Sequence, residues 1–249
     1  MADIDAAAAR ETAIAAATAS RELLRSSPAL DPRSAIGRDI KLEEDTGSEA
    51  LITGVLREHS PYPIMSEEAG WIGARPGAGE PFWAVDPLDG SYNYFRGAPL
   101  CCTSVALCID RRPILGAVFD FNRDELFFGG AGLGLSLNGE PLPPPTRATG
   151  VLATGFPVRG DFSAESLTKI ALGFQRWTKI RMIGSAALSL AWVAAGRFDA
   201  YEEAGIGWFD VAAGLALVEG AGGVFAVEGE SLDQPLSVLA MGGEMARKR

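Results

Sequence analysis

The sequence predicts an α+β protein in which helices are layered on sheets, and three patterns along the chain support this. Residues 3–26 and 43–58 carry apolar side chains at helical spacing, the middle of the chain holds short apolar runs that end in acids, and the part beyond Pro145 alternates strands with helices. With 249 residues, 47% of them apolar, the chain is long enough for one large domain or two joined subdomains and too apolar to be disordered.

The first part is expected to open with two helices, over residues 3–26 and 43–58, and Pro28 and Pro32 end the first of them. Asp45 and Glu49 lie one turn apart on the second helix, and Glu49 is interpreted as part of its solvated face. The segment from Arg33 to Lys41 has no clear period and is interpreted as a loop.

Strands are expected to follow these helices. They begin at Ile64 and Trp83, with a Gly- and Pro-rich loop over 71–81 between them, and continue over 101–110 and 114–121. A turn at 122–124 predicts a hairpin with residues 125–128. The glycine-rich run 129–134 lacks the Gly-Lys-Ser/Thr ending of a phosphate loop, so we interpret it as strand and turn.

A cluster of four prolines, Pro141, Pro143, Pro144 and Pro145, is the linker that is expected to divide the chain into residues 1–145 and 146–249. Beyond it the expected strands cover 151–155, 179–182, 198–202, 224–227 and 238–241. The expected helices cover 163–178, 186–195 and 210–219.

Charge and composition restrict the function classes. The net charge of −10 argues against nucleic acid as the main partner, because phosphate backbones call for patches of Lys and Arg. The three cysteines have no metal-ligand spacing and indicate reduced thiols of a cytoplasmic protein, with adjacent Cys101 and Cys102 on opposite faces of a strand. The single histidine, His59, has a polar, helix-ending context that predicts a surface position. Neither a signal peptide nor a membrane partner is expected.

The stretch from Trp83 to Tyr94 concentrates the residue types that chemistry needs. A buried strand is expected to end in Asp86 and Asp89, after which Gly90 lets the chain turn. Ser91 then stands where a helix begins, and unpaired N–H groups at a helix start suit an anion. The alternative is an ordinary turn rich in Asp and Gly, without a function.

Five acids are each expected at the end of a strand or in a helix next to a loop: Asp45, Glu67, Asp86, Asp89 and Asp210. If the fold gathers them, they repel one another unless a cation lies between them. Oxygen-only ligands favour Mg²⁺, with Mn²⁺ possible, over zinc. Two such ions bind a phosphate, activate a water and stabilise the leaving oxygen.

Two long stretches resemble the signatures of the inositol monophosphatase family, within the Mg²⁺-dependent, lithium-sensitive phosphatase superfamily. They are Trp83 to Tyr94 and Trp208 to Gly223, and Ser66-Glu67-Glu68 is similar to the Gly-Glu-Glu motif of that family. The resemblance runs from about Asp3 to the final strand. It implies a layered αβαβα sandwich of two subdomains (the sugar phosphatase fold), two or three Mg²⁺ ions and a homodimer.

The resemblance also implies residue roles. The metal ligands would be Glu67, Asp86, the Leu88 carbonyl, Asp89 and Asp210. Gly90 and Ser91 would bind the phosphate through their backbone, and the Ser91 hydroxyl, in place of a usual threonine, would activate the attacking water with Asp45, alongside Glu67. Glu203, Ser185 and Ala186 would contact the substrate.

The chain departs from the family pattern in three places. Lys41-Leu42-Glu43-Glu44 precedes Asp45 where Val-Thr is usual, so the sequence does not determine the geometry of the third metal site. Gly207 stands where a larger side chain is common, which predicts a roomier pocket. Tyr92-Asn93 follows Ser91 where bisphosphate nucleotidases tend to have Lys-Glu, which counts against a nucleotide substrate.

These observations favour a Mg²⁺-dependent phosphomonoesterase that hydrolyses a small polyol or sugar phosphate, most simply myo-inositol monophosphate. The implied mechanism is direct attack of a metal-activated water, with no phosphoenzyme. Alternative substrates on the same fold are fructose 1,6-bisphosphate, histidinol phosphate and a 3'(2'),5'-bisphosphate nucleotide. A haloacid-dehalogenase phosphatase would need Asp-x-Asp, whereas the spacing here is Asp86-x-x-Asp89. A non-catalytic interaction protein would have no reason to keep five mutually repelling acids.

Overall fold

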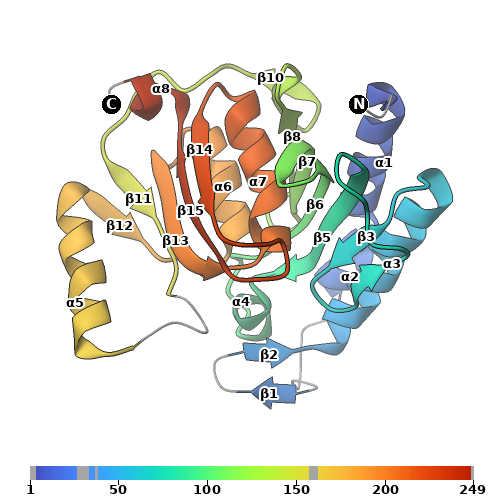
Figure 1. The fold of residues 1–249 in the computed structure, drawn as a ribbon, viewed down its shortest axis with the longest axis horizontal. Coiled ribbons are helices and arrows are strands. Elements are labelled where there is room, and N and C mark those ends of the chain that lie inside the picture. The colour runs from blue at the N-terminus through green and yellow to red at the C-terminus, as the bar shows by residue number, and fades with distance from the viewer. Residues whose placement is uncertain (1–3, 27–33, 37–38, 157–161, 248–249) are drawn as a thin grey trace.

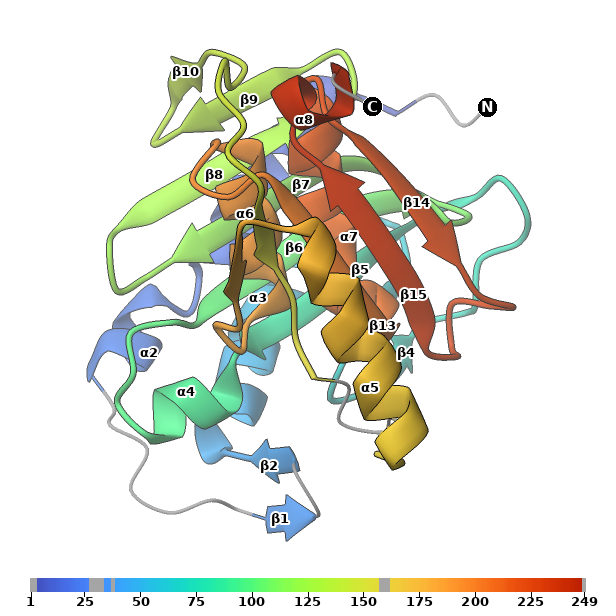
Figure 2. The same cartoon turned by 90° about the vertical axis from the view of Figure 1, so that its left-hand side faces the viewer.

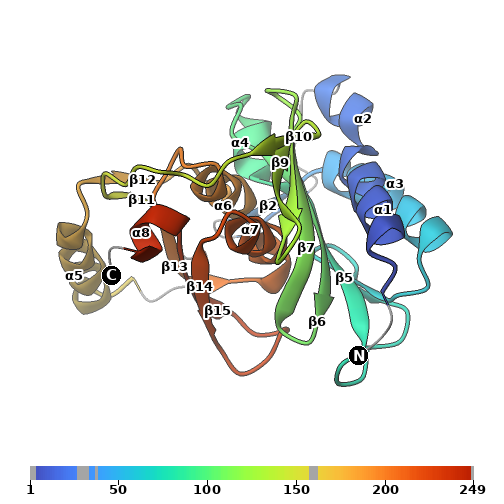
Figure 3. The ribbon, with the colours of Figure 1, turned by 90° about the horizontal axis from the view of Figure 1, so that it is seen from above.

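The computed structural model describes residues 4–26, 34–36, 39–156 and 162–247, and these residues form alternating layers of helices and sheets (Figure 1). Seen from above, the order is a helix layer, a large sheet, a central helix pair, a smaller sheet and an outer helix (Figure 3). This is the layered α+β sandwich that the sequence predicts. The helices are α1 (Ala6–Thr18), α2 (Arg21–Ser26), α3 (Glu43–His59), α4 (Ser91–Phe95), α5 (Ala164–Gly173), α6 (Ala186–Ala194), α7 (Trp208–Gly220) and α8 (Gly243–Arg247).

The larger sheet is built from the first part of the chain, in the order β10-β9-β8-β7-β6-β5-β3-β4. Only the β3–β5 pair is parallel among these described strands. Their bounds are β3 (Ile64–Ser66), β4 (Gly70–Ile72), β5 (Pro81–Asp89), β6 (Cys102–Ile109), β7 (Arg112–Asp120), β8 (Glu125–Gly130), β9 (Gly134–Leu137) and β10 (Glu140–Leu142).

The smaller sheet has the order β12-β11-β13-β15-β14, with β11 parallel to both of its neighbours. Helices α6 and α7 separate it from the larger sheet, and Figure 2 shows α5 lying over its outer side. The strands are β11 (Val151–Ala153), β12 (Lys179–Arg181), β13 (Ala200–Ile206), β14 (Val224–Glu228) and β15 (Leu236–Met241).

Alternation along strands of the larger sheet places their buried side chains in two core clusters, one on each face of this sheet. Trp83 and Val85 of β5 pack in the cluster that contains α1 and α3, whereas Phe82 and Ala84 pack in the cluster that contains α6 and α7. Cys101 and Cys102 divide in the same way, as predicted, and both are free thiols. The second cluster includes side chains from both sheets, so the two parts of the chain share a core.

Several element boundaries differ from the prediction. The first expected helix is split into α1 and α2, and the expected loop over 33–41 contains a short antiparallel pair, β1 (Ser34–Ile36) and β2 (Asp39–Lys41); Arg33 and residues 37–38 lie outside the described residues. The expected loop over 71–81 begins inside β4, because pairing with β3 supplies order that its composition does not indicate. Three-residue strands are set by their partners, and their own periodicity is too short to detect.

Within the described residues, no helix combines the length and apolar character needed to cross a membrane.

Candidate active site

The parallel pairing of β3 with β5 brings the first two acids together. Ser66 lies opposite Val85 in the register, and the Glu67 N–H donates to the Val85 carbonyl at 3.1 Å. Glu67 therefore leaves β3 level with Asp86 on β5. The carboxyl ends of adjacent parallel strands lie side by side, and the ends of strands are where the acids were expected.

The β5 strand becomes irregular where its acids begin. Its register with β6 shifts between Asp86 and Asp89, and the Leu88 N–H donates to Asp86 Oδ1 at 3.0 Å. Gly90 then adopts a φ of 91°, and a Cβ there would lie 2.8 Å from the Leu100 carbonyl oxygen. Only glycine fits this turn without strain, so it fixes the start of α4.

Asp45 and Asp210 occupy equivalent places at the starts of two helices. Asp45 Oδ2 accepts the Leu42 N–H at 2.7 Å before α3, and Asp210 Oδ2 accepts the Gly207 N–H at 2.8 Å before α7. Each carboxylate satisfies an otherwise unpaired donor at its helix start. One oxygen of each thus fixes the helix, and the side chain is held toward the site.

The carboxylates of Glu67, Asp86 and Asp210 form one cluster, in which a ligand oxygen of each lies within 4.8 Å of the others. Burial, followed by the charge of Asp210, raises the pKa of Glu67 well above its ordinary value, and burial with Glu67 does the same for the pKa of Asp86. Burial and Asp89 raise the pKa of Asp210 to about 8. Three mutually repelling oxygen donors at this spacing fit a hard divalent cation, which would relieve the repulsion.

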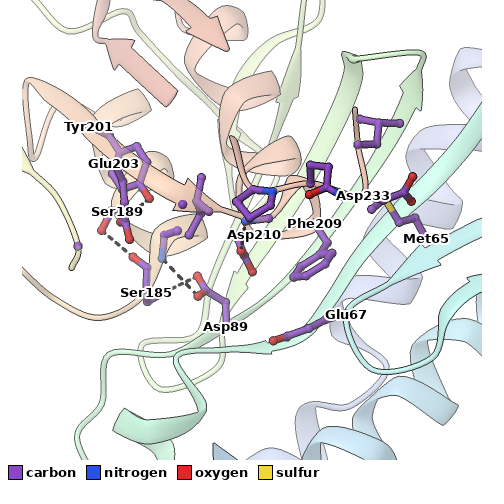
Figure 4. Close-up of a pocket in the computed structure, with 18 of the residues that line it drawn as sticks. Met65, Glu67, Asp89, Ser185, Ser189, Tyr201, Glu203, Phe209, Asp210 and Asp233 are labelled. Carbon is purple, nitrogen blue, oxygen red and sulfur yellow. Dashed lines mark hydrogen bonds between the residues drawn. The ribbon is translucent and has the colours of Figure 1, made fainter. Parts of the chain in front are cut away.

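Asp89 is not part of that cluster, because its carboxylate binds the start of α6. Asp89 Oδ2 accepts the Ser185 hydroxyl and the Ala187 N–H, both at 2.6 Å, and Oδ1 accepts the Ala186 N–H at 3.3 Å (Figure 4). An acid at a helix N-terminus is favourable. Ser185 and Ala186, expected as substrate contacts, line the cleft but are also the partners that join Asp89 to the second part of the chain.

Ser91 lies between Asp45 and the end of β5. Its hydroxyl is 3.1 Å from Asp45 Oδ1 and 2.9 Å from the Leu88 carbonyl oxygen. Three residues expected in the site from separate arguments therefore meet at one oxygen atom. The Ser91 hydroxyl can accept a proton from a neighbouring water while it passes its own proton to Asp45.

A cleft of about 500 Å³ lies beside these acids and is lined by both parts of the chain. Glu203 of β13 lies in its wall, where its Oε2 accepts the Tyr201 hydroxyl at 2.7 Å. Burial raises the pKa of Glu203 to about 7, although the bond from Tyr201 opposes this. In Figure 4, Glu67 and Asp210 approach the same space from opposite sides, with Glu203 farther along the cleft.

Two features of the site were missed or misread from sequence. Glu49 is not simply solvated, since its Oε1 accepts hydrogen bonds from the Ser66 hydroxyl and, at 2.9 Å, from the Ala69 N–H. Its position one turn after Asp45 was a signal that could have indicated this. The second feature is Asp233, whose Oδ1 accepts the Trp71 indole N–H at 3.0 Å at the cleft wall; no local pattern marks it.

Comparison with known proteins agrees with this geometry. The sequence model of the inositol monophosphatase family matches residues 4–247. An inositol-1-monophosphatase of Synechocystis sp. is 36% identical over 198 residues, which are 75% of this chain and 66% of that protein, slightly under two thirds of its length. The Nus factor SuhB of Pseudomonas aeruginosa is 37% identical over 84% of this chain and 81% of its own.

The fold of this chain is also similar to those of solved structures. An inositol monophosphatase from Anabaena (Nostoc) sp. has a TM-score of 0.82 at 30% identity, covering 98% of this chain and 94% of its own. The extragenic suppressor protein suhB from Bartonella henselae has a TM-score of 0.83 at 25% identity, covering 98% and 96%. From its sequence match and its layered fold, this chain belongs to the inositol monophosphatase family.

Proposed function

We propose that this protein is a Mg²⁺-dependent phosphoric monoester hydrolase that acts on a small phosphorylated polyol, with myo-inositol monophosphate as the first substrate to test. The observation that carries the proposal is the cluster of Glu67, Asp86 and Asp210. Two of its members, Glu67 and Asp210, line the cleft, and the strand that ends beyond Asp86 leads to the Ser91–Asp45 pair. Family membership and the relatives named as inositol monophosphatases support the same reaction.

The acids would hold Mg²⁺ through Glu67, Asp86 and Asp210, with Asp89 and the Leu88 carbonyl as the further expected ligands. When bound, Mg²⁺ supplies the charge that neutralises the phosphate, activates a water and stabilises the leaving oxygen. Two or three ions are proposed. A carboxylate whose pKa is raised in the metal-free protein must lose its proton on binding, so metal affinity rises with pH.

Ser91 and Asp45 handle the proton of the attacking water. Asp45 Oδ1 accepts the Ser91 hydroxyl, while Asp45 Oδ2 is held by the Leu42 N–H, so the acceptor has a fixed direction. A water that gives its proton toward Ser91 Oγ becomes the nucleophile. The Gly90 and Ser91 N–H groups are proposed to bind the phosphate oxygens.

Glu203 is proposed to bind hydroxyl groups of the leaving alcohol. It lies in the cleft wall, where the Tyr201 hydroxyl and the Gly155 N–H hold its carboxylate in a fixed orientation. A polyol has several hydroxyl donors for such an acceptor. Fructose 1,6-bisphosphate, histidinol phosphate and a 3'(2'),5'-bisphosphate nucleotide are the competing substrates.

The test is phosphate release from this panel by the purified protein, with Mg²⁺ and with chelator. We expect Mg²⁺-dependent release, greatest from myo-inositol monophosphate, and its loss in Asp86→Asn and Asp210→Asn. Asp110→Asn is the matched control, because exposed Asp110 follows the opposite end of β6 from the site. Full activity of Asp86→Asn, or release that chelator does not reduce, would contradict the proposal.

A second candidate role follows from the name Nus factor, which relatives from Xylella fastidiosa and Pseudomonas aeruginosa bear. A folded Asp86→Asn variant that still performs it in cells would separate the two functions. The homodimer, the cytoplasmic location and the division at residue 145 stay predictions, and light scattering of the purified protein tests the first.

A further inference from the structure

One face of α3 contacts three separate segments of the candidate site. Asp45, Ser48 and Glu49 have the i, i+3, i+4 spacing that places side chains on the same side of a helix. Asp45 meets Ser91, Ser48 Oγ donates to the Pro87 carbonyl oxygen at 2.7 Å, and Glu49 binds the segment that carries Glu67. One turn of helix therefore contacts both segments that carry the clustered acids of the first part of the chain, Glu67 and Asp86.

The Ser48 contact holds β5 where the sheet does not. The β5–β6 register includes Asp86 and Asp89 but skips Pro87 and Leu88 between them, so the ladder does not fix this interval. Ser48 is fully buried, and its hydroxyl provides the Pro87 carbonyl with a partner. The direction of the chain between two proposed ligands is thus set from α3.

The Glu49 contact holds the other acid-bearing segment from both sides of Glu67. Ser66 precedes Glu67 and donates its hydroxyl to Glu49 Oε1, while the Ala69 N–H donates to the same oxygen at 2.9 Å. Hydrogen bonds to a carboxylate are stronger than those between neutral groups. One carboxylate oxygen of Glu49 therefore accepts both hydrogen bonds that hold this turn.

We propose that Ser48 and Glu49 are positioning residues, which set the separation of the Glu67 and Asp86 carboxylates and so the affinity for Mg²⁺. The inference rests on the proposed function, since it assigns Mg²⁺ to those carboxylates. Neither residue touches the reacting atoms. Partners behind metal ligands typically change metal affinity by about 10- to 100-fold when they are removed.

The test is calorimetric titration of substrate-free protein with Mg²⁺, alongside the Mg²⁺ dependence of phosphate release. We expect Glu49→Ala to weaken Mg²⁺ binding by about tenfold or more and Ser48→Ala by a smaller factor. Glu49→Gln keeps an acceptor oxygen and should restore most of the affinity. Substrate KM at saturating Mg²⁺ should change by less than about twofold, because Glu203 and Ser185, which line the part of the cleft contributed by the second part of the chain, are unchanged.

Glu58→Gln is the control, since Glu58 is an exposed acid near the end of the same helix. Mg²⁺ affinity of Glu49→Ala equal to that of this control would overturn the inference. If Glu49→Ala does not fold, Ser66→Gly decides, because it removes one donor and leaves α3 unchanged; unaltered affinity there would also overturn it. A wild-type protein that binds no Mg²⁺ would overturn the proposed function together with this inference. If wild type binds Mg²⁺ and Glu49→Ala binds it as tightly as Glu58→Gln does, the inference alone is overturned.

Discussion

At the scale of single residues, the site depends on which oxygen of each acid is already occupied. Asp45 and Asp210 each use one oxygen for a helix start, whereas Asp89 uses both for the start of α6. The acids are therefore unequal in the metal-free protein. The carboxylate of Asp89 is held by the start of α6, whereas those of Glu67, Asp86 and Asp210 lie against one another.

Ser91→Ala removes the hydroxyl that links Asp45 with the Leu88 carbonyl. We expect kcat to fall by about 10²-fold or more, as for loss of a group that transfers protons, while stability falls by only about 1 kcal/mol. Ser91→Thr keeps the hydroxyl and should retain activity. Steady-state kinetics at saturating Mg²⁺ checks this, and unaltered kcat in the alanine variant would exclude the assigned role.

Tyr201→Phe removes the hydrogen bond that lowers the pKa of Glu203, which lies at about 7 when the bond is present. Because the charged carboxylate is the better acceptor for substrate hydroxyls, KM should rise as pH falls through about 7 in the wild type. In Tyr201→Phe this rise should occur at higher pH. KM measured from pH 5.5 to 9 is the readout, and Tyr62→Phe, outside the cleft lining, serves for comparison.

At the scale of elements, loops from opposite parts of the chain meet at the cleft. Asp233, in the turn between β14 and β15, binds the Trp71 indole of β4 and also pairs with Arg75. Trp71 in turn packs against Phe82 with ring centroids 5.3 Å apart. The turn that contains Asp233 thus covers the end of the cleft next to β4.

Asp233→Ala should release this turn without unfolding the protein. The variant loses an exposed ion pair and an exposed hydrogen bond from Trp71, each of which contributes about 1 kcal/mol, so the free energy of unfolding should fall by no more than about 2 kcal/mol. Amide hydrogen exchange in residues 70–75 and 229–235 should become faster, because the two segments lose their mutual contact. Exchange rates equal to those of Glu165→Gln, an exposed acid of α5, would show that the contact does not hold the turn.

At the scale of the whole molecule, the candidate site joins the two sheets. Asp210 comes from the second part of the chain and meets Glu67 and Asp86 from the first, and Asp89 reaches α6. A cation bound there would stabilise the folded state alone, since the unfolded chain does not gather these acids. Repulsion within the metal-free cluster should oppose folding in a pH-dependent way.

In chelator, we expect thermal stability to fall as pH rises from 6 to 9. The pKa of Asp210 is raised to about 8, so the folded state favours its protonated form; that stabilisation is complete below the ordinary pKa and is lost as pH rises through about 8. Asp210→Asn should flatten the dependence, and Mg²⁺ should raise Tm most at high pH. Thermal scans with and without Mg²⁺ measure both effects, and a Tm independent of pH would contradict them.

The sequence by itself determined the acids, the turn glycine and most helices and long strands. Strand alternation, helix spacing and the Asp-x-x-Asp-Gly-Ser order are local patterns, because they reflect hydrogen bonding and burial within a few residues. The tertiary structure decided which side chains meet. The parallel β3–β5 pairing set Glu67 beside Asp86, packing of α3 turned Glu49 toward the site, and α6 took the Asp89 carboxylate. These contacts join segments distant in sequence, and no short-range pattern encodes strand order or helix packing.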